Sequence, residues 1–372
     1  MLRLYDAVAA GMWAYSNAAF RVETLARRRF ELEPGTLIVA THRRETDVPL
    51  LAPPLYYRAG LWRKGATPMS FAARDDMFLR GFFAGFPPTL SPRLRRLLYP
   101  VGVGRWLPSV EVHPIRSANS ARLAELLATQ PAQRLEDLAP ATAVARFAAR
   151  AEALRLPRPE TAGAALRAEY ADLLWTPVSR ADVALPDFWS RRAAEATRDF
   201  RALVDLVRGG GILLVFPEGR PSPVGDFGPL RPGIGALVRR AKPRRIQPLA
   251  LAYDPLVHGR TRVFVSIPDP VDPPADNVEE ALLALMRRAA PLTAGQLVAS
   301  ALTTTGSADL RELAAAADRS IDEARAEERP IDPSLLRPRE RRRRLAEAIA
   351  TGFARPRELD FLAREFASAR AA

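Results

Sequence analysis

The sequence contains no cysteine and only three histidines in 372 residues. Without cysteine the chain has no disulfide, no thiol nucleophile and no thiolate metal site, and it is compatible with a reducing cytoplasm. The histidines, His42, His113 and His258, stand far apart and have no carboxylate cluster at ligand spacing, so we expect no metal. Any base catalysis near neutral pH therefore depends on very few imidazoles.

Long hydrophobic runs are also lacking, since no stretch reaches the roughly 18 apolar residues of a membrane-spanning helix. The best candidate is the uncharged stretch AVAAGMWAYSNAAF (residues 7–20). Its pattern predicts an amphipathic helix, within an N-terminal region of residues 1–30, that is either packed on the core or lies at a membrane interface. We expect no signal peptide, because the first strand follows almost at once.

Lysine is scarce as well. Only Lys64 and Lys242 are lysines among 55 basic residues, so 53 are arginines, and the formal net charge is +13. A basic surface favours anionic partners such as phosphate esters, acidic lipid headgroups or nucleic acid. We expect no nucleic acid, because neither a binding motif nor a clustered basic and aromatic face is recognisable.

Short β-rich runs alternate with helical stretches along the chain. The runs are TLIVATH, TPMSFAAR, PSVEVHPI, GGILLVFPEG, RRIQPLALAY and TRVFVSIP. This alternation predicts an α/β domain at residues 31–290 with a mostly parallel, buried sheet flanked by helices. Ligands bind at the carboxyl ends of such strands, which is where His42 and Glu218 stand.

Two segments break this alternation. Residues 117–207 are rich in Ala, Arg and Glu with Pro breaks, and predict a helical insertion between two halves of the sheet domain. Residues 291–372 predict a helical C-terminal region. Within it, the run RPRERRRR (residues 337–344) indicates either a solvated helix start or a contact with an anionic membrane or partner.

The stretch ATHRRETDVPLL (residues 40–51) places His42 and Asp47 at a strand end and in the first turn of the next helix. A histidine accepts protons near neutral pH, and a carboxylate on its far ring nitrogen fixes the tautomer and stabilises the imidazolium. The spacing predicts that Asp47 reaches back to His42. A second stretch, LLVFPEGRPSP (residues 213–223), runs from a buried strand into Glu218, which must be in a site or paired because burying a lone charge is costly.

These two stretches together resemble the glycerophospholipid acyltransferase family, which includes the 1-acylglycerol-3-phosphate and glycerol-3-phosphate acyltransferases. Members of that family carry an N-H-x-x-x-x-D block and an F-P-E-G-T-R-S block. Three further stretches are similar to its other blocks, in the same order: SFAARDDMF with Arg74, VEVHPIRSANSAR with Arg116, and FGPLRPGIGALVRRAKPRRIQPLAL with Arg231 and Pro248. The resemblance covers residues 35–270 in pieces.

The resemblance implies transfer of a fatty acyl group from acyl-CoA or acyl-carrier protein to a hydroxyl of a glycerol phosphate or lysophospholipid. His42 would be the general base and Asp47 would orient it. Arg116 would bind the phosphate, Glu218 and Gly219 would shape the acceptor site, and Arg74, Arg220 and Arg231 are further candidates for substrate binding. Neither a metal nor a cofactor beyond the thioester co-substrate is implied.

The chain departs from the family pattern in three places. Thr41 replaces the Asn before the histidine, and Arg220 and Pro221 stand where Thr and Arg are usual. Many more residues separate His42 from Glu218 than in the common bacterial enzymes, which is why we interpret the insertion as a lid or as an acyl-chain or carrier-binding module. The C-terminal region faintly resembles the helical tail of the larger glycerol-3-phosphate acyltransferases.

Other residues have simpler interpretations. His113 and His258 are expected to be structural or surface histidines, and Gly209–Gly211 to be a helix cap and turn rather than a nucleotide-binding loop. The aromatic stretch MFLRGFFAGFPP (residues 77–88) is either ordinary core or an acyl-facing or membrane-facing patch. Arg43 and Arg44 are either simply exposed or placed at the mouth of the site to attract anionic substrate.

The sequence therefore predicts a bacterial acyltransferase of phospholipid synthesis, peripheral at the cytoplasmic face of the cell membrane. The leading acceptor is 1-acylglycerol 3-phosphate, with glycerol 3-phosphate as the alternative. A non-catalytic lipid-binding protein of the same fold is a further alternative, against which His42, Asp47 and Glu218 argue.

Overall fold

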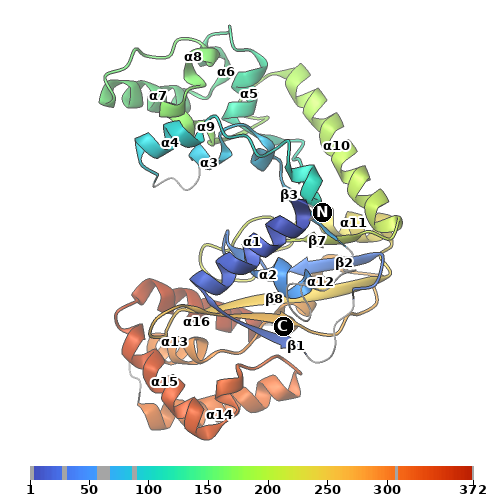
Figure 1. Ribbon diagram of the computed structural model, residues 1–372, viewed down its shortest axis with the longest axis vertical. Coiled ribbons are helices and arrows are strands. Elements are labelled where there is room, and N and C mark those ends of the chain that lie inside the picture. Colours follow the sequence, from blue (N-terminus) through green and yellow to red (C-terminus); the bar gives the residue numbers. More distant parts are fainter. Residues whose placement is uncertain (1–3, 27–31, 57–67, 86–89, 306–308, 371–372) are drawn as a thin grey trace. The chain divides into compact units, whose positions relative to one another are not determined.

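The computed structural model describes the chain except for residues 1–3, 27–31, 57–67, 86–89, 306–308 and 371–372. The chain divides into two compact units, one formed by Met1–Phe71 and Val204–Ala372 and the other by Ala72–Leu203 (Figure 1). The second unit contains most of the insertion expected at residues 117–207, but it begins earlier along the chain.

The first unit contains a mixed sheet of mostly parallel strands flanked by helices. Its strands are β1 (Arg21–Ala26), β2 (Thr36–Ala40), the start of β3 (Met69–Arg74), whose last three residues belong to the second unit, β7 (Ile212–Val215), β8 (Arg245–Asp254) and β9 (Arg262–Ile267). They follow the order β1-β9-β8-β2-β7-β3. Only the β8 and β9 pair is antiparallel, so the α/β class is confirmed.

Continuous apolar runs form the strands at the centre of this sheet. β2 (TLIVA) and β7 (ILLV) are buried along their full length. The two strands pair with each other, and Leu37 of β2 lies opposite Leu213 of β7. Fully apolar strands are typical of a parallel sheet covered on both faces. Because β2 and β7 are parallel, the residues that follow them, Thr41 and His42 on one side and Phe216 and Glu218 on the other, emerge at the same edge of the sheet.

The N-terminal region contains the helix that the sequence predicts, followed by a strand that it does not. Helix α1 (Leu4–Ala19) ends well before residue 30, and the short, partly polar β1 follows it as an edge strand beside β9. One face of α1 packs on α2 (Asp47–Tyr56), where Ser16 Oγ donates to the carbonyl oxygen of Pro49 at 2.5 Å. Trp13 and Tyr15, on either side of this buried face, are exposed.

Six helices follow the central strands in the first unit. They are α11 (Gly233–Ala241), α12 (Val278–Ala289), α13 (Ala294–Thr305), α14 (Leu310–Ala326), α15 (Pro338–Gly352) and α16 (Pro356–Arg370). The last four, orange to red in Figure 1, pack around a common apolar core that also takes in Leu256 from the β8–β9 connection. The C-terminal region is therefore joined to the sheet.

Buried ion pairs hold these C-terminal helices to the sheet. Arg344, in α15, donates to Asp254 at the end of β8 at 2.9 Å. Residues 337–344 are mostly exposed at the start of α15, as a solvated helix start would be, and Arg344 differs because it is buried. Arg262, in β9, pairs with Asp332 at 2.8 Å and with Glu23 of β1 at 3.0 Å.

The second unit is largely helical around a small core. Its helices are α3 (Phe82–Gly85), α4 (Pro92–Leu98), α5 (Leu123–Thr129), α6 (Leu135–Leu138), α7 (Ala141–Ala153), α8 (Ala162–Ala165), α9 (Ala171–Leu174) and most of α10 (Pro186–Arg208). Its strands are β4 (Val112–Ile115) and the antiparallel pair β5 (Ser120–Arg122) and β6 (Pro177–Ser179). Trp189, Phe147 and Tyr170 are fully buried in the core.

The long helix α10 ends as the sequence predicts. Gly210 has a φ of +88°, a left-handed conformation that favours glycine, and the Gly211 N–H donates to the carbonyl oxygen of Leu206. This arrangement satisfies the last carbonyl groups of the helix, so the triple glycine is a helix cap. The chain then turns directly into β7.

None of the described helices combines the length and the apolar character that crossing a membrane requires. Within the same residues, no three His, Cys, Asp or Glu side chains gather as a metal site would need.

Replacing Arg262 by Met tests the ion pairs between the sheet and the C-terminal helices. The Asp332 side chain has no exposed surface, so losing Arg262 leaves a buried carboxylate without its partner. We expect the free energy of unfolding to fall by about 3–5 kcal/mol, measured by urea denaturation. Arg245→Met is the matched control, because its partner Asp272 is 84% exposed, and it should cost about 0–1 kcal/mol. Equal losses in the two variants would contradict this account.

Candidate active site

His42 lies directly after β2, in a segment whose backbone is held on both sides. The N–H of His42 donates to Glu218 Oε1 at 3.0 Å, and its carbonyl oxygen accepts from the Ser222 N–H at 3.1 Å. Thr41, just before it, accepts from the Leu251 N–H of β8 through its hydroxyl at 3.0 Å. The threonine therefore bonds to the neighbouring strand, and the two stretches identified in the sequence meet at His42.

The Asp47 carboxylate orients the His42 ring, as the sequence predicts. Asp47 Oδ2 lies 2.9 Å from His42 Nδ1 and also accepts from the N–H groups of Arg43 and Arg44, at 2.5 and 3.0 Å. Asp47 Oδ1 accepts from the Tyr253 hydroxyl at 2.7 Å. A carboxylate is an acceptor, so Nδ1 carries the proton and Nε2 presents its lone pair. In the described part of the chain no hydrogen bond is made by Nε2.

The other face of the ring is fixed by an aromatic contact. His42 stacks on Phe216, which follows β7, with ring centroids 4.3 Å apart and an angle of 25° between the planes. The His42 side chain keeps 14% of its surface exposed, whereas Asp47 keeps none. The imidazole is thus held by a carboxylate and a ring while its outer edge remains accessible.

Arg43 differs from both interpretations offered by the sequence, since its side chain is fully buried. Its guanidinium lies 3.3 Å from Glu365 Oε1 in α16 and 3.9 Å from Glu218 Oε2, and it sits over the Phe227 ring at 4.0 Å. It also donates to the carbonyl oxygens of residues 225 and 226. Arg43 therefore neutralises buried carboxylates, and the idea that it attracts substrate at the mouth of the site is wrong.

Arg44 remains nearer the surface. Its guanidinium donates to Glu358 of α16 at 2.9 Å and lies over the Tyr253 ring at 4.7 Å. Both side chains of this pair are 35% exposed. Arg44 therefore joins the segment after His42 to the same C-terminal helix that supplies Glu365.

Helix α16 supports the second loop of the site as well. The Phe227 N–H donates to Ser368 Oγ at 2.9 Å. Gly225 has a φ of +94°, and a Cβ there would lie 2.3 Å from the carbonyl oxygen of Phe361, so only glycine fits. The last helix is thus in direct contact with both loops around His42. In the sequence it is an ordinary amphipathic helix, and no local signal marks Glu365 as a partner of the site.

Burial raises the pKa of two of these carboxyls. Glu218 and Glu365 have pKa values above the usual range of a glutamate because both are desolvated, and Arg43 opposes the effect by stabilising their charged forms. Burial and the adjacent Asp47 charge likewise raise the pKa of the Tyr253 hydroxyl, which therefore remains a hydrogen-bond donor to Asp47. Glu218 acts here on the backbone of His42 and on Arg43.

Gly219 and two exposed arginines border the site. Gly219 has a φ of +75° in the turn after Glu218, and a Cβ on it would lie 3.1 Å from Cγ of Arg231. The Arg231 N–H donates to the carbonyl oxygen of Pro217 at 2.8 Å. Arg220 and Arg231 are exposed, so the loop that fixes His42 also presents two guanidinium groups to solvent.

The other predicted substrate-binding arginines, Arg74 and Arg116, belong to the second unit. Arg74 pairs with Asp76. Arg116 pairs with Asp199 at 2.6 Å and with Glu195 at 3.5 Å. Both arginines therefore have carboxylate partners within their own unit. In the first unit the structure brings together His42, Asp47, Glu218, Gly219 and Arg231, with Arg220 next to them in the same loop.

The remaining histidines lie outside this constellation. His258 lies in the connection between β8 and β9, and its backbone N–H donates to Glu347 Oε1 at 2.7 Å. His113, in β4, lies 3.7 Å from Glu111. Among the described residues, neither ring has a hydrogen-bond partner that would orient it as Asp47 orients His42.

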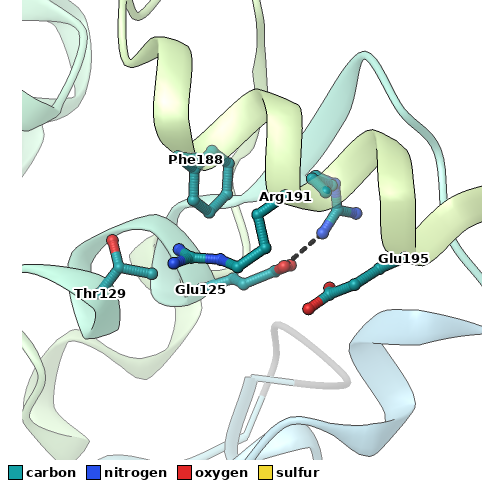
Figure 2. Close-up of a pocket in the computed structure, with 6 residues that line it drawn as sticks. Glu125, Thr129, Phe188, Arg191 and Glu195 are labelled. Atoms are coloured by element: carbon teal, nitrogen blue, oxygen red, sulfur yellow. Dashed lines mark hydrogen bonds and ion pairs between the residues drawn. The ribbon is translucent and has the colours of Figure 1, made fainter.

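A cavity of about 270 Å³ in the second unit is a different kind of site. It lies between α5 and α10 and is lined by Glu125, Thr129, Phe188, Arg191, Arg192 and Glu195 (Figure 2). Arg192 pairs there with Glu125 and Asp75. Its charged groups balance one another and include no oriented base, so His42 remains the candidate for catalysis.

Comparison with known proteins gives little further information. No protein-family model matches the chain, and no curated protein matches it. Among solved structures, the chain is similar to the 1-acyl-sn-glycerophosphate acyltransferase from Thermotoga maritima, with 12% identity, a TM-score of 0.38, and coverage of 77% of this chain and 79% of that one. At this distance, the function has to be argued from the residues of the site.

Replacing Arg43 by Met tests the buried charge network. Glu218 and Glu365 would lose their cation, and we expect the free energy of unfolding to fall by about 3–5 kcal/mol at neutral pH. A carboxyl group whose pKa is raised by folding contributes least to the stability of the protein when the pH is above that pKa, because the buried group is then ionised. The loss should therefore become smaller as the pH is lowered and these carboxyls take up protons.

The control is Arg44→Met, which removes the neighbouring, partly exposed arginine and should cost about 0–1 kcal/mol. Thermal and urea denaturation of both variants across pH would measure the difference. An Arg43→Met loss that is as small as that of Arg44→Met, or that grows toward acidic pH, would contradict the account.

Proposed function

We propose that this chain is an acyltransferase that moves a fatty acyl group from an acyl thioester to a hydroxyl of 1-acylglycerol 3-phosphate. The observation that carries the proposal is the 2.9 Å contact between His42 Nδ1 and the buried Asp47 carboxylate, which leaves Nε2 as a base at a strand end. The resemblance of five ordered sequence blocks to the glycerophospholipid acyltransferases supplies the reaction.

The chemistry needs no enzyme nucleophile. His42 Nε2 takes the proton of the acceptor hydroxyl as its oxygen attacks the thioester carbonyl, forming a C–O bond and a tetrahedral intermediate. The intermediate collapses with cleavage of the C–S bond, and the imidazolium returns the proton to the departing thiolate. Asp47 stabilises the imidazolium in between, and such general base catalysis contributes roughly 10²–10⁴ in rate.

Anion binding is assigned to the exposed arginines beside His42. Arg220 and Arg231 border the loop of Glu218 and Gly219 and can form bidentate contacts with a phosphate. Arg116 would have to leave Asp199 and Glu195 to do so, which makes it the weaker candidate in this arrangement. Glu218 and Gly219 would shape the acceptor site by fixing the backbone around His42.

The finer features of the proposal follow the sequence. The donor is acyl-CoA or acyl-carrier protein, and no metal or other cofactor takes part in the steps above. Glycerol 3-phosphate is the alternative acceptor. We place the protein in bacterial phospholipid synthesis, peripheral at the cytoplasmic face of the membrane with an anionic lipid surface as its partner and no nucleic acid.

Thiol release from a long-chain acyl-CoA, and from acyl-carrier protein as donor, tests this function. The assay compares lysophosphatidate, glycerol 3-phosphate and no acceptor. We expect acceptor-dependent release, and His42→Ala should lower it by roughly 10²–10⁴. Asp47→Asn should lower kcat by a similar factor without adding to the loss of His42→Ala, because the two residues act as a unit.

Tyr253→Phe is the matched control, since it removes one hydrogen bond to Asp47 and leaves the contact with His42 in place. It should retain most of the activity. Release that is equal in wild type and His42→Ala, or absent with every donor and acceptor, would overturn the proposal in favour of a non-catalytic lipid-binding protein.

A further inference from the structure

Exposed apolar side chains are concentrated in one short part of the second unit. Twelve large apolar side chains are exposed in the described part of the chain, and five of them lie between residues 83 and 106. They are Phe83 (41% exposed), Leu94 (39%), Leu97 (70%), Val101 (43%) and Trp106 (53%). Clustering of this kind marks a surface that contacts a partner or a membrane.

The orientation of α4 is set by its inner face. Arg95 is buried and pairs with Asp172 at 2.8 Å, and the Tyr99 hydroxyl donates to the carbonyl oxygen of Leu166 at 3.0 Å. With those residues turned inward, Leu94 and Leu97 stand on the outer side, three positions apart and therefore neighbours on the helix surface. The exposed ridge is thus fixed by the packing beneath it.

The segment that carries this ridge contributes only basic charge. Residues 77–110 contain five arginines and neither Asp nor Glu. Arg95 is buried, but Arg80, Arg93, Arg96 and Arg105 are exposed, and Arg96 forms an ion pair with Glu169 at 3.3 Å. The long stems of arginine let the charge reach outward beside apolar neighbours, as at a membrane interface.

Trp106 adds the side chain that is most typical of such an interface. Its ring is more than half exposed and the Arg105 guanidinium lies 5.0 Å from its centroid. Tryptophan is enriched at the level of lipid headgroups, where one part of the ring is apolar and the other is wet. A ridge of leucines bordered by positively charged arginines suits the surface of an anionic lipid membrane. Such a surface is fluid, so its headgroups need not match the positions of the arginines.

We infer that Leu94, Leu97, Val101 and Trp106, with Arg93, Arg96 and Arg105, form a docking surface for anionic lipid membranes. This inference rests on the proposed function, and it adds the place of the membrane contact. The contact would serve acyl transfer because an amphiphilic acceptor lies in the same lipid layer. The inference places the contact on α4 and the segment after it, whereas the sequence offered the N-terminal helix, residues 77–88 and residues 337–344 as candidates.

Binding of the full chain to vesicles tests the surface without acyl donor or acceptor. Wild type should sediment with phosphatidylcholine and phosphatidylglycerol vesicles, bind phosphatidylcholine alone much more weakly, and lose affinity as salt is added. Each arginine removed, as in Arg93→Gln or Arg105→Gln, should weaken binding by about fivefold, and Leu97→Ser should weaken it by about tenfold or more.

Phe353→Ser is the matched control, because Phe353 is 67% exposed, nearly as much as Leu97, but lies in the first unit. It should bind as wild type does, and so should His42→Ala, which separates this test from the test of catalysis. Acyl transfer that fails while vesicle binding depends on Leu97 would leave this inference standing.

Three results would overturn the inference. Leu97→Ser could bind vesicles as tightly as wild type, or Trp13→Ser in α1 could abolish binding while the α4 variants do not. Alternatively, wild type could fail to bind anionic vesicles while Leu97→Ser changes its oligomeric state, which would make the ridge a contact between copies of the chain.

Discussion

The buried carboxylate of Asp47 is the interaction on which the candidate site depends. It accepts from His42 Nδ1, from two backbone N–H groups and from the Tyr253 hydroxyl, and it has no contact with solvent. Those four bonds satisfy a charge that would otherwise be costly to bury. They also fix the turn after β2, the start of α2 and the tautomer of the imidazole, so one side chain determines both local structure and chemistry.

A second buried charge extends the site across the whole first unit. The turn that Asp47 fixes directs the Arg43 side chain into the interior. A buried guanidinium is stable only beside carboxylates that neutralise its charge. Glu218 comes from the loop after β7 and Glu365 from the last helix, so segments from the beginning, middle and end of the chain meet behind His42. The C-terminal region therefore belongs to the surroundings of the site, and its helices are held to the sheet by the pairs of Arg262 and Arg344.

Local pattern was sufficient for much of the fold. The strands β2, β7, β8 and β9 were predictable because their apolar runs are continuous, and His42 with Asp47 because one turn brings them together. The sequence placed His42 and Glu218 each at the end of a strand, and the parallel pairing of β2 and β7 in the structure brings the two ends side by side. The contact of Glu218 with the backbone N–H of His42 did not follow from the sequence, since residue type alone does not say which group a carboxylate reaches.

Long-range contacts account for what the sequence concealed. Arg43 and Arg44 are adjacent arginines, and only the fold makes one buried and the other partly exposed. Glu365 sits in a helix like other amphipathic helices, so its partner is visible only in space. β1 escaped prediction because a short, partly polar edge strand carries little apolar pattern, and it is defined by its pairing with β9.

The tautomer of His42 is the most direct test of whether Asp47 leaves Nε2 free to act as the base. The chain has only three histidines, so the imidazole nitrogen spectrum of uniformly 15N-labelled protein is small, and the His42→Ala spectrum assigns the signal. The account predicts a neutral ring protonated on Nδ1, with that proton shifted downfield by its bond to Asp47 and the shift lost in Asp47→Asn. A neutral His42 protonated on Nε2 in wild type would contradict it, because the nitrogen facing the acceptor could then not serve as the base.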